Sequence, residues 1–411
     1  MHSQSNWKKK FAMIFSGQLF SILTSSMVMF SIIWHLTETT GSASVLMIAG
    51  LVGFMPQALL GPFIGVWLDR WNRKATMMIA DGSIALSSLL LGAYFALGEP
   101  NLLFVYAVLL IRSTATAFHA PSFQAAIPLI APADQLTRVA GWQQMVFSCS
   151  TIFGPALGIA VYSASSLEMV LFLDVIGALI ANAMLLMVKI HQPKPETVQA
   201  PAFFRELKLG WETFVAVKPV VITTFATAVF GIVFMPLGML FPLMTLQHFG
   251  LGGYSASLIE AVFSVGMVLG SLLLSVFAGK LKDTTFMSLS LILIGLTCAA
   301  SGLLSSGAFA VFVVLSFLMG GGAPLFNGPY MAMIQKSFEP EKLGRVLSFV
   351  TSITMLSSPI GLALAGSIVE KYGVETWFFW AGVMVVFTGL FIYAQFRRKS
   401  MNEGPAGLPG A

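Results

Sequence analysis

Five ionisable side chains stand within or beside apolar stretches that otherwise lack charge. Asp81, Arg112, Asp174 and Glu260 fall inside such stretches, and Glu38 falls just beyond the first. A charge in membrane hydrocarbon costs about 2.5–3.5 kcal/mol on insertion scales, so each is a candidate for function. A carboxylate can bind and release a proton, whereas a guanidinium keeps its charge and alters a neighbouring carboxylate. The alternative for Arg112 is a structural arginine that binds backbone carbonyls.

Depth separates the three carboxylates inside the stretches. Asp174 and Glu260 each lie about 9 Å from the outer end of a stretch, at 1.5 Å per helical residue, where external water can reach. No second charge lies within a helical turn of Glu260, which makes it the stronger proton candidate. Asp174 has an alternative role in holding helices together through Asn182 or a neighbouring span. Asp81 lies near the inner start of its stretch, two turns from Arg73, and could simply belong with that arginine.

Composition places these charges in a membrane. The chain has 411 residues, of which 57% are hydrophobic and only 9% charged. A soluble protein of this size would carry about 25% charged residues. Apolar runs reach about 20 residues, the length that a helix needs to cross the hydrocarbon. Strand-like alternation is absent, so spanning helices are expected rather than a β-barrel.

The apolar pattern predicts twelve membrane-spanning helices, and the fold class is therefore an all-α integral membrane protein. The longest two contain proline and glycine, which predicts a kink or an extension past the bilayer. The expected limits are 11–36, 44–68, 75–97, 102–125, 139–163, 168–189, 218–247, 255–280, 284–305, 307–336, 346–371 and 375–396.

Basic residues predict the orientation. If the spans are as given, 20 of the 22 Lys and Arg residues fall on the side of the N-terminus. Because loops rich in Lys and Arg stay in the cytoplasm, both termini are expected there. This asymmetry also explains the basic net charge of +5, so no nucleic-acid partner is needed.

The chain reads as a duplicated unit. Pro121 and Pro132 stand eleven residues apart in the first half, and Pro329 and Pro340 stand eleven apart in the second. The stretch "LTR" after the first pair corresponds to "LGR" after the second. An even number of spans in each half gives both halves the same orientation, which is a parallel repeat.

The longest polar stretch divides the predicted repeats. We expect an N-terminal six-helix bundle over 1–189, a cytoplasmic linker over 190–217, and a C-terminal six-helix bundle with a short tail over 218–411. Two six-helix bundles related by a parallel pseudo-repeat are the architecture of major facilitator transporters, whose site lies near the bilayer midplane.

A dense charge cluster follows the second predicted span. The stretch "GVWLDRWNRK" contains Gly65, Asp69, Arg70, Arg73 and Lys74, in a short turn on the cytoplasmic side. This pattern resembles the gating motif of the major facilitator superfamily. The resemblance implies that the aspartate approaches the positive N-terminus of the eleventh helix and braces the closed cytoplasmic side. The alternative is a positive-inside loop with an incidental aspartate.

A second signature lies in the fifth predicted span. The stretch "GPALG" places Gly154, Pro155 and Gly158 where the antiporter motif of drug-exporting facilitators is expected. The glycines permit tight helix packing, and the proline removes one backbone hydrogen bond and bends the helix. Ordinary small-residue packing is the alternative.

Longer stretches resemble a narrower family. "NWKKKFAMIFSGQLFSILTSS", "HLTETTGSASVL" and "FLDVIGALIA" are similar to the Mef-type macrolide efflux proteins of the third drug:proton antiporter group. The resemblance implies proton-driven export of 14- and 15-membered macrolides from a bacterial inner (plasma) membrane, by a monomer without a cofactor. It also implies cooperation with a separate ribosome-protection or ATP-binding protein. Related groups export siderophores or move lysophospholipids, and these remain alternatives.

The resemblance also directs attention to the cavity-lining spans one, four, seven and ten. Methionine and phenylalanine suit a bulky hydrophobic drug, although most such residues in a membrane bundle face lipid or core. The candidates are Gln18, Met29, Phe118, Phe230, Phe234 and Met235. No enzyme motif or nucleotide-binding loop occurs, so no catalytic residue is predicted. The five histidines, which include His119, have no metal-ligand spacing, and loop or helix-end roles are expected for them.

Overall fold

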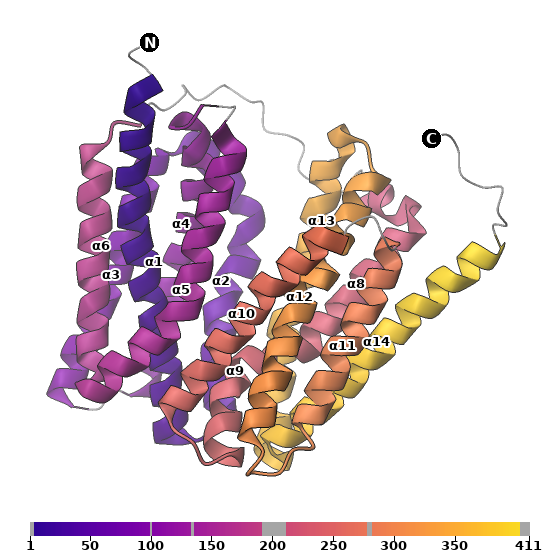
Figure 1. Ribbon diagram of the computed structural model, residues 1–411. Coiled ribbons are helices and arrows are strands. Elements are labelled where there is room, and N and C mark those ends of the chain that lie inside the picture. Colours follow the sequence, from indigo (N-terminus) through magenta and orange to yellow (C-terminus); the bar gives the residue numbers. More distant parts are fainter. Residues whose placement is uncertain (1–3, 99–100, 133–134, 191–210, 278–281, 403–411) are drawn as a thin grey trace. The chain divides into compact units, whose positions relative to one another are not determined.

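Helices account for all the regular structure that the model describes. The computed structural model covers residues 4–98, 101–132, 135–190, 211–277 and 282–402, and no strand occurs within these ranges (Figure 1). Twelve of the described helices or helical runs are long and apolar enough to cross a membrane. Their limits agree with the predicted spans to within a few residues at most ends, so the predicted all-α fold with twelve spans is confirmed.

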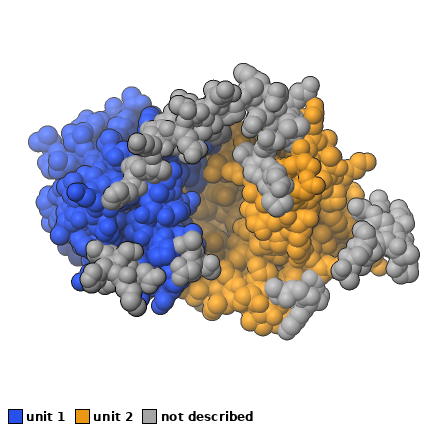
Figure 2. All heavy atoms as spheres, turned by 90° about the horizontal axis from the view of Figure 1, so that it is seen from above, with its two compact units in different colours: residues 1–198, 251–261 blue, residues 199–250, 262–411 orange. Residues whose placement is uncertain are grey.

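The chain divides into two compact units, which are coloured separately in Figure 2. Unit 1 comprises residues 1–198 and 251–261, and unit 2 comprises residues 199–250 and 262–411. The helix α10 (Gly253–Phe277) therefore contributes its first turns to unit 1 and the rest to unit 2. Most of the predicted linker over 190–217 lies outside the described residues.

In unit 1 six long helices form one bundle. In this bundle α1 packs against α5 and α6, α3 packs against α4 and α6, and α2 packs against α4. The helices are α1 (Gln4–Thr40), α2 (Ala43–Arg70), α3 (Arg73–Leu97), α4 (Leu102–Ala126), α5 (Leu136–Ala164) and α6 (Leu167–Met187), with the short 3-10 helix η1 (Ile127–Leu129) after α4.

In unit 2 the corresponding contacts recur, since α8 packs against α13 and α14, and α11 packs against α12 and α14. The elements are α8 (Lys218–Phe234), α9 (Pro236–Leu243), the π-helix η3 (Met244–His248), the later part of α10, α11 (Asp283–Ser301), α12 (Phe309–Ser337), α13 (Pro340–Tyr372) and α14 (Val374–Asn402).

Local sequence explains where the helices of unit 1 begin. Ser42, Asn72 and Asn101 occupy the N-cap positions of α2, α3 and α4, and each side chain accepts a hydrogen bond from a backbone N–H in the first turn. Such caps satisfy donors that have no partner within the helix. Only residues 71 and 72 separate α2 from α3, as the predicted short turn requires.

The seventh span is interrupted. The helix α8 ends at Phe234, α9 begins at Pro236, and η3 follows from Met244 to His248. Proline at 236 cannot donate a backbone hydrogen bond to the preceding turn, which accounts for the break. The kink predicted for this span is confirmed. The tenth span, α12, is one continuous helix although it contains Pro324 and Pro329.

Candidate functional site

The shortest ion pair among the described residues joins two charges that the sequence singled out separately. Nη1 of Arg112, on α4, lies 2.6 Å from Oδ2 of Asp174, on α6. The Ser88 hydroxyl on α3 donates to the same carboxylate oxygen at 2.8 Å, and the Ser25 hydroxyl on α1 donates to Oδ1 at 2.9 Å. Arg112 also donates to Ser88. Four helices therefore meet at one carboxylate.

Burial makes this network energetically important. Arg112 is 7% exposed and Asp174 is 1% exposed, so each charge has lost most of its contact with solvent or lipid. Removal of one member would leave the other as an unpaired buried charge. The structural alternative for Asp174 named Asn182 or a neighbouring span, and its partners Arg112, Ser25 and Ser88 are all on neighbouring spans. The predicted link between Arg112 and a nearby carboxylate is present.

A cavity of about 310 Å³ reaches this network from one end of the bundle. It lies between α3 and α6, and its lining includes Ser88, Gly92, Ser166 and Glu168. Ser166 and Glu168 stand at the first turn of α6, whereas Ser88 belongs to the buried network. The cavity thus runs from the polar end of α6 toward the Arg112–Asp174 pair.

Asp81 belongs to a second buried group and not to the charge cluster after α2. Its Oδ1 lies 3.4 Å from Nε2 of His119 and accepts a hydrogen bond from the Ser21 hydroxyl at 3.2 Å. Its Oδ2 lies 3.5 Å from Nε2 of Gln18. Arg73 instead donates to a backbone carbonyl of α4, so the interpretation of Asp81 as a partner of this arginine is wrong.

Two further expectations are corrected by this second group. Gln18 was a candidate for the drug cavity, but it is fully buried and directed at Asp81. His119 was expected at a loop or helix end, but it lies within α4 and is only 8% exposed. The sequence did not reveal the contact between His119 and Asp81, because the two residues lie on different helices.

The remaining carboxylate candidates differ in environment. Glu260 lies on α10 and is partly buried, and no hydrogen bond or ion pair engages its carboxylate within the described residues. Glu38 is exposed near the end of α1 and accepts a hydrogen bond from the Tyr162 hydroxyl at 3.0 Å. His35 contacts the same hydroxyl at 3.1 Å. Glu38 therefore lies at the surface end of the bundle, apart from the buried pairs.

Two basic residues of the gating motif, Arg73 and Lys74, bind helix C-termini. Nη1 of Arg73 donates to the carbonyl of Ala125, one residue before the end of α4, at 2.8 Å. Nζ of Lys74 donates to the carbonyl of Val188, just past the end of α6, at 2.9 Å. Cations at helix C-termini satisfy free carbonyls and complement the helix dipole. The motif therefore joins α3 to α4 and α6. The environments of Gly65 and of the Asp69 and Arg70 side chains lie outside what the structure describes.

The antiporter motif forms a close helix crossing in unit 1. A Cβ atom added at Gly154 would lie 2.3 Å from the Ser26 hydroxyl, and one added at Gly158 would lie 2.7 Å from the carbonyl of Met27, both on α1. Pro155 lies inside α5 between these contacts. The tight packing predicted from the two glycines is thus present.

Unit 2 contains an equivalent close crossing, in which one glycine lies on each of the two helices. A Cβ atom at Gly231 of α8 would lie 2.3 Å from Ser357 of α13, and one at Gly361 of α13 would lie 2.1 Å from the carbonyl of Ile232. The two crossings join equivalent helices of the sequence repeat.

Aromatic residues of α8 and α12 pack together in unit 2 and are called here the aromatic wall. The ring centroids of Phe230 and Phe234 lie 4.7 Å apart, and Phe230 lies 5.6 Å from Phe326. Phe326 stacks on Tyr330 at 5.8 Å, and the Tyr330 hydroxyl is 2.9 Å from that of Thr224. The sequence predicted Phe230 and Phe234 here but missed Phe326 and Tyr330.

Other cavity candidates occupy different places. Phe118 packs against Trp67 and Trp71, with ring centroids 5.7 and 5.8 Å away, and lines a cavity of about 480 Å³ between α3 and α4. The Met29 methyl group lies close to Gly53 of α2. Met235 is exposed at the break between α8 and α9.

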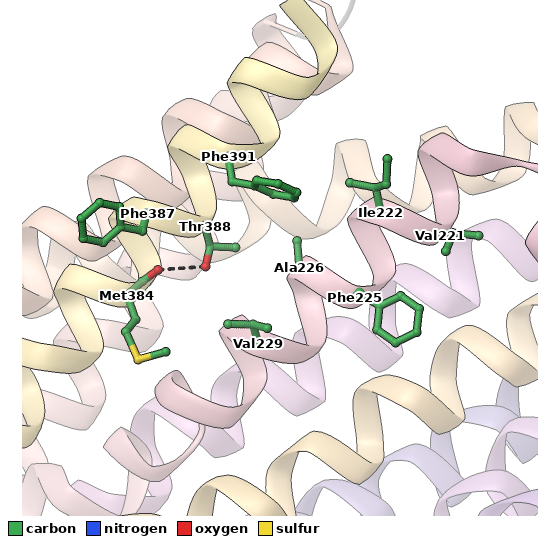
Figure 3. Close-up of a pocket in the computed structure, with 9 residues that line it drawn as sticks. All are labelled: Val221, Ile222, Phe225, Ala226, Val229, Met384, Phe387, Thr388 and Phe391. Atoms are coloured by element: carbon green, nitrogen blue, oxygen red, sulfur yellow. Dashed lines mark hydrogen bonds between the residues drawn. The ribbon is translucent and has the colours of Figure 1, made fainter. Parts of the chain in front are cut away.

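A cavity of about 590 Å³ lies between α8 and α14 (Figure 3). Phe391 extends from α14 toward Ile222 and Ala226 of α8, and the lining side chains are apolar apart from the Thr388 hydroxyl, which donates to its own helix. Phe387, at its rim, is 66% exposed, so this cavity opens on the outer surface of unit 2.

The sequence repeat relates this cavity to a close crossing in unit 1. Glu168 of α6 corresponds to Glu375 of α14, and at the same offset Gly177 corresponds to Met384. Gly177 allows α6 to touch Thr24 of α1, at a Cβ distance of 2.3 Å. Met384 on α14 lines the cavity, and α14 contacts α8 less extensively than α6 contacts α1.

Comparison with known protein families decides the family. The model of the Major Facilitator Superfamily matches residues 14–259 and 223–410. The chain belongs to the Major Facilitator Superfamily. It is thus a multi-pass membrane transporter with the fold that the repeat and the twelve spans predict.

Within the superfamily, this transporter is 38% identical to "Macrolide efflux protein A" of Streptococcus pyogenes over 389 residues, which are 94% of this chain and 96% of the relative. A protein of the same name from Enterococcus faecalis is 38% identical over 325 residues, 78% of this chain and 100% of the relative. The "Uncharacterized MFS-type transporter YfiS" of Bacillus subtilis is 25% identical and covers 87% of each chain.

Solved structures with the same fold are more distant in sequence. The nucleoside transporter NupG matches with a TM-score of 0.73 at 12% identity, covering 94% of this chain and 99% of NupG. A bacterial homologue of the iron transporter ferroportin matches with a TM-score of 0.73 at 14% identity, covering 93% and 98%. These similarities establish the fold only.

Proposed function

We propose that this facilitator exports macrolide antibiotics across a bacterial plasma membrane in exchange for protons. The observation that carries the substrate class is the 38% identity to "Macrolide efflux protein A" along 94% of the chain. The aromatic wall formed by Phe230, Phe234, Phe326 and Tyr330 supports a bulky apolar ligand, because aromatic faces offer large contact areas at low entropic cost.

Proton coupling is supported by the intramembrane carboxylates. Asp174 is held by Arg112, and the cavity between α3 and α6 touches Ser88, which donates a hydrogen bond to Asp174. Glu260 is a second candidate because its carboxylate has no charged partner among the described residues. One proton moving down 100 mV releases about 2.3 kcal/mol. That energy supports a drug gradient of roughly fifty-fold per proton, at 1.36 kcal/mol per tenfold.

The proposed orientation places both termini in the cytoplasm, on the basis of the Lys and Arg asymmetry. The protein would then work as a monomer that needs no cofactor and draws its energy from the proton gradient. Cooperation with a separate ribosome-protection or ATP-binding protein belongs to the same proposal.

Drug accumulation in cells tests the substrate and the energy source together. Cells that express the protein should accumulate less of a 14-membered macrolide than cells without it, and a protonophore should abolish the difference while ATP is clamped. Siderophores and labelled lysophospholipid belong in the same panel. Selective export of either of these, with no effect on macrolides, would replace the substrate assignment. Export that persists without a proton gradient would refute the coupling.

Proton-carrying residues are tested with isosteric variants. Glu260→Gln should retain drug binding and downhill exchange but lose uphill export. Uphill export at the wild-type rate in this variant would exclude Glu260 and leave Asp174 as the next residue to test.

A further inference from the structure

A second acid–base pair lies in the same bundle as the Arg112–Asp174 pair. Asp81 of α3 is 2% exposed, and His119 of α4 is 8% exposed, with Nε2 of the imidazole 3.4 Å from Oδ1 of the carboxylate. Gln18 and Ser21 of α1 complete the group. Neither the family assignment nor the predicted motifs give these four residues a role.

The two pairs are stacked along the same helices. Asp81 and Ser88 are seven residues apart on α3, and His119 and Arg112 are seven apart on α4. Seven residues are two turns, or about 10.5 Å of helix. Each pair therefore occupies one layer of the α1, α3 and α4 packing, and the Arg112 layer also includes α6.

An apolar layer separates the two pairs. Ile84 lies between Asp81 and Ser88 on α3, and Ala115 lies between Arg112 and His119 on α4. Ile84 and Ala115 pack together with Ala80, and both are less than 9% exposed. The cavity between α3 and α6 reaches Ser88 but not Asp81. The Arg112 layer, and not the Asp81 layer, therefore borders this cavity.

Hydrogen bonding in the Asp81 group is incomplete within the described residues. The His119 nitrogen is at ion-pair distance from the carboxylate but lacks hydrogen-bond geometry, and Oε1 of Gln18 has no donor. A proton on His119 would supply a donor to Asp81. A proton on Asp81 would make its carboxyl group a donor to the Gln18 amide oxygen, once the amide is rotated by about 180°. This rotation exchanges the positions of the amide oxygen and nitrogen.

Other charges on the neighbouring helices are engaged elsewhere or lie away from the pair. Arg112 and Asp174 bind each other, and Arg73 and Lys74 bind the C-termini of α4 and α6. Glu168 lines the cavity at the far end of α6. The other ionisable groups on the packed helices are Lys8, Lys9, Lys10, His35 and Glu38 on α1, Tyr94 on α3, Tyr106 on α4, Arg138, Cys149 and Tyr162 on α5, and Asp69 and Arg70 on α2, of which the last two have side chains outside the described part.

We propose that Asp81 and His119 together bind one transported proton. They would form a second proton-binding site, two helical turns along α3 and α4 from the Arg112–Asp174 pair. The proton adds to Nε2 of His119 or to a carboxylate oxygen of Asp81, and it later leaves the same atom for water, with no other bond broken. With the proton bound, the pair is neutral as a whole and can be buried at a lower cost than a lone carboxylate. This inference rests on the proposed proton-coupled export.

Proton release on drug binding tests the pair directly. The purified protein in lipid nanodiscs, in weakly buffered solution with a pH-sensitive dye, is mixed with the macrolide erythromycin. The wild type should release about one proton per drug bound, counted for the coupled sites together. Asp81→Asn and His119→Gln should each reduce the release to less than about half while drug binding is retained. Ser83→Ala is the matched control and should release as many protons as the wild type, because its hydroxyl donates to the Ile79 carbonyl of its own helix α3 and not to the pair.

Each outcome decides the inference. Asp81→Glu, which keeps a carboxylate, should restore part of the release that Asp81→Asn loses. Undiminished release in both Asp81→Asn and His119→Gln overturns this inference alone, since the wild type still couples protons to the drug. An absence of release from the wild type overturns the proton coupling and this inference together. If Asp81→Asn cannot bind the drug, the comparison rests on His119→Gln, in which the amide keeps a donor and an acceptor.

Discussion

Asp174→Asn should destabilise the protein far more than its small change in shape suggests. Asparagine has one amide oxygen, so only one of the hydrogen bonds from Ser25 and Ser88 keeps its acceptor, and the charge opposite Arg112 is lost as well. Because Arg112 is 7% exposed, its charge would remain buried without a counter-charge. Breaking such a pair costs about 3–5 kcal/mol.

The double variant Arg112→Met with Asp174→Leu should recover most of this loss. Replacing both members of a buried pair by apolar side chains of similar volume is often neutral or stabilising, by about 1–4 kcal/mol. The matched control is Asn182→Leu on the same helix, because Oδ1 of Asn182 has no hydrogen-bond partner within the described residues. Its replacement should therefore cost little.

A double-mutant cycle measures the coupling between the two positions. The free energy of unfolding in mixed micelles is measured for the wild type, Arg112→Met, Asp174→Leu and the double variant. A strong coupling energy between the two positions is expected. Additivity of the two single substitutions, within about 0.5 kcal/mol, would refute the claim that the pair holds α4 and α6 together. Loss of transport in the recovered double variant would separate its role in export from its role in stability.

Three further substitutions test other parts of the structure. Gly158→Leu should reduce the yield of folded protein, because even a Cβ atom would lie 2.7 Å from a carbonyl of α1, whereas Gly238→Ala, where nothing lies within 4 Å, should express normally. Lys74→Ala should lower the free energy of unfolding by about 0.3–1 kcal/mol through loss of the helix C-terminal contact, and the loss should shrink at high salt. Phe230→Ala should weaken macrolide binding by about 0.5–1.5 kcal/mol, measured as Kd, while Phe387→Ala on the outer surface should leave it unchanged. An equal effect of the two phenylalanine variants would exclude the aromatic wall as the drug site.

Sequence alone was sufficient for the spans and their repeat, because apolar length and the positions of Pro121 and Pro329 are local properties. It also identified Arg112 and Asp174 as functional candidates, because a charge in an apolar run is costly wherever its partner lies. Their pairing depends on how α4 turns toward α6, and helix rotation is set by packing across the bundle. The sequence therefore predicted that Arg112 acts on a neighbouring carboxylate, but not that Ser25 and Ser88 bind the same carboxylate.

His119 shows what local inspection leaves out. The residue lies near Pro121 and close to the end of its apolar stretch, so a helix-end role was the simpler interpretation. A comparison of heptad positions would have found the stacked layers, since Arg112 and His119 repeat the seven-residue spacing of Ser88 and Asp81. Gln18 was misassigned for a similar reason, because its position on a cavity-lining helix does not reveal which face of that helix it occupies.

Transport into proteoliposomes tests proton-driven macrolide export most directly. The purified protein is reconstituted into vesicles without ATP, and an acidic interior is imposed in an alkaline medium that contains radiolabelled erythromycin. Outward proton flow should drive the drug into the vesicles above its external concentration, and a protonophore should release it. Equal drug levels with and without the imposed gradient, or accumulation that survives the protonophore, would contradict the account.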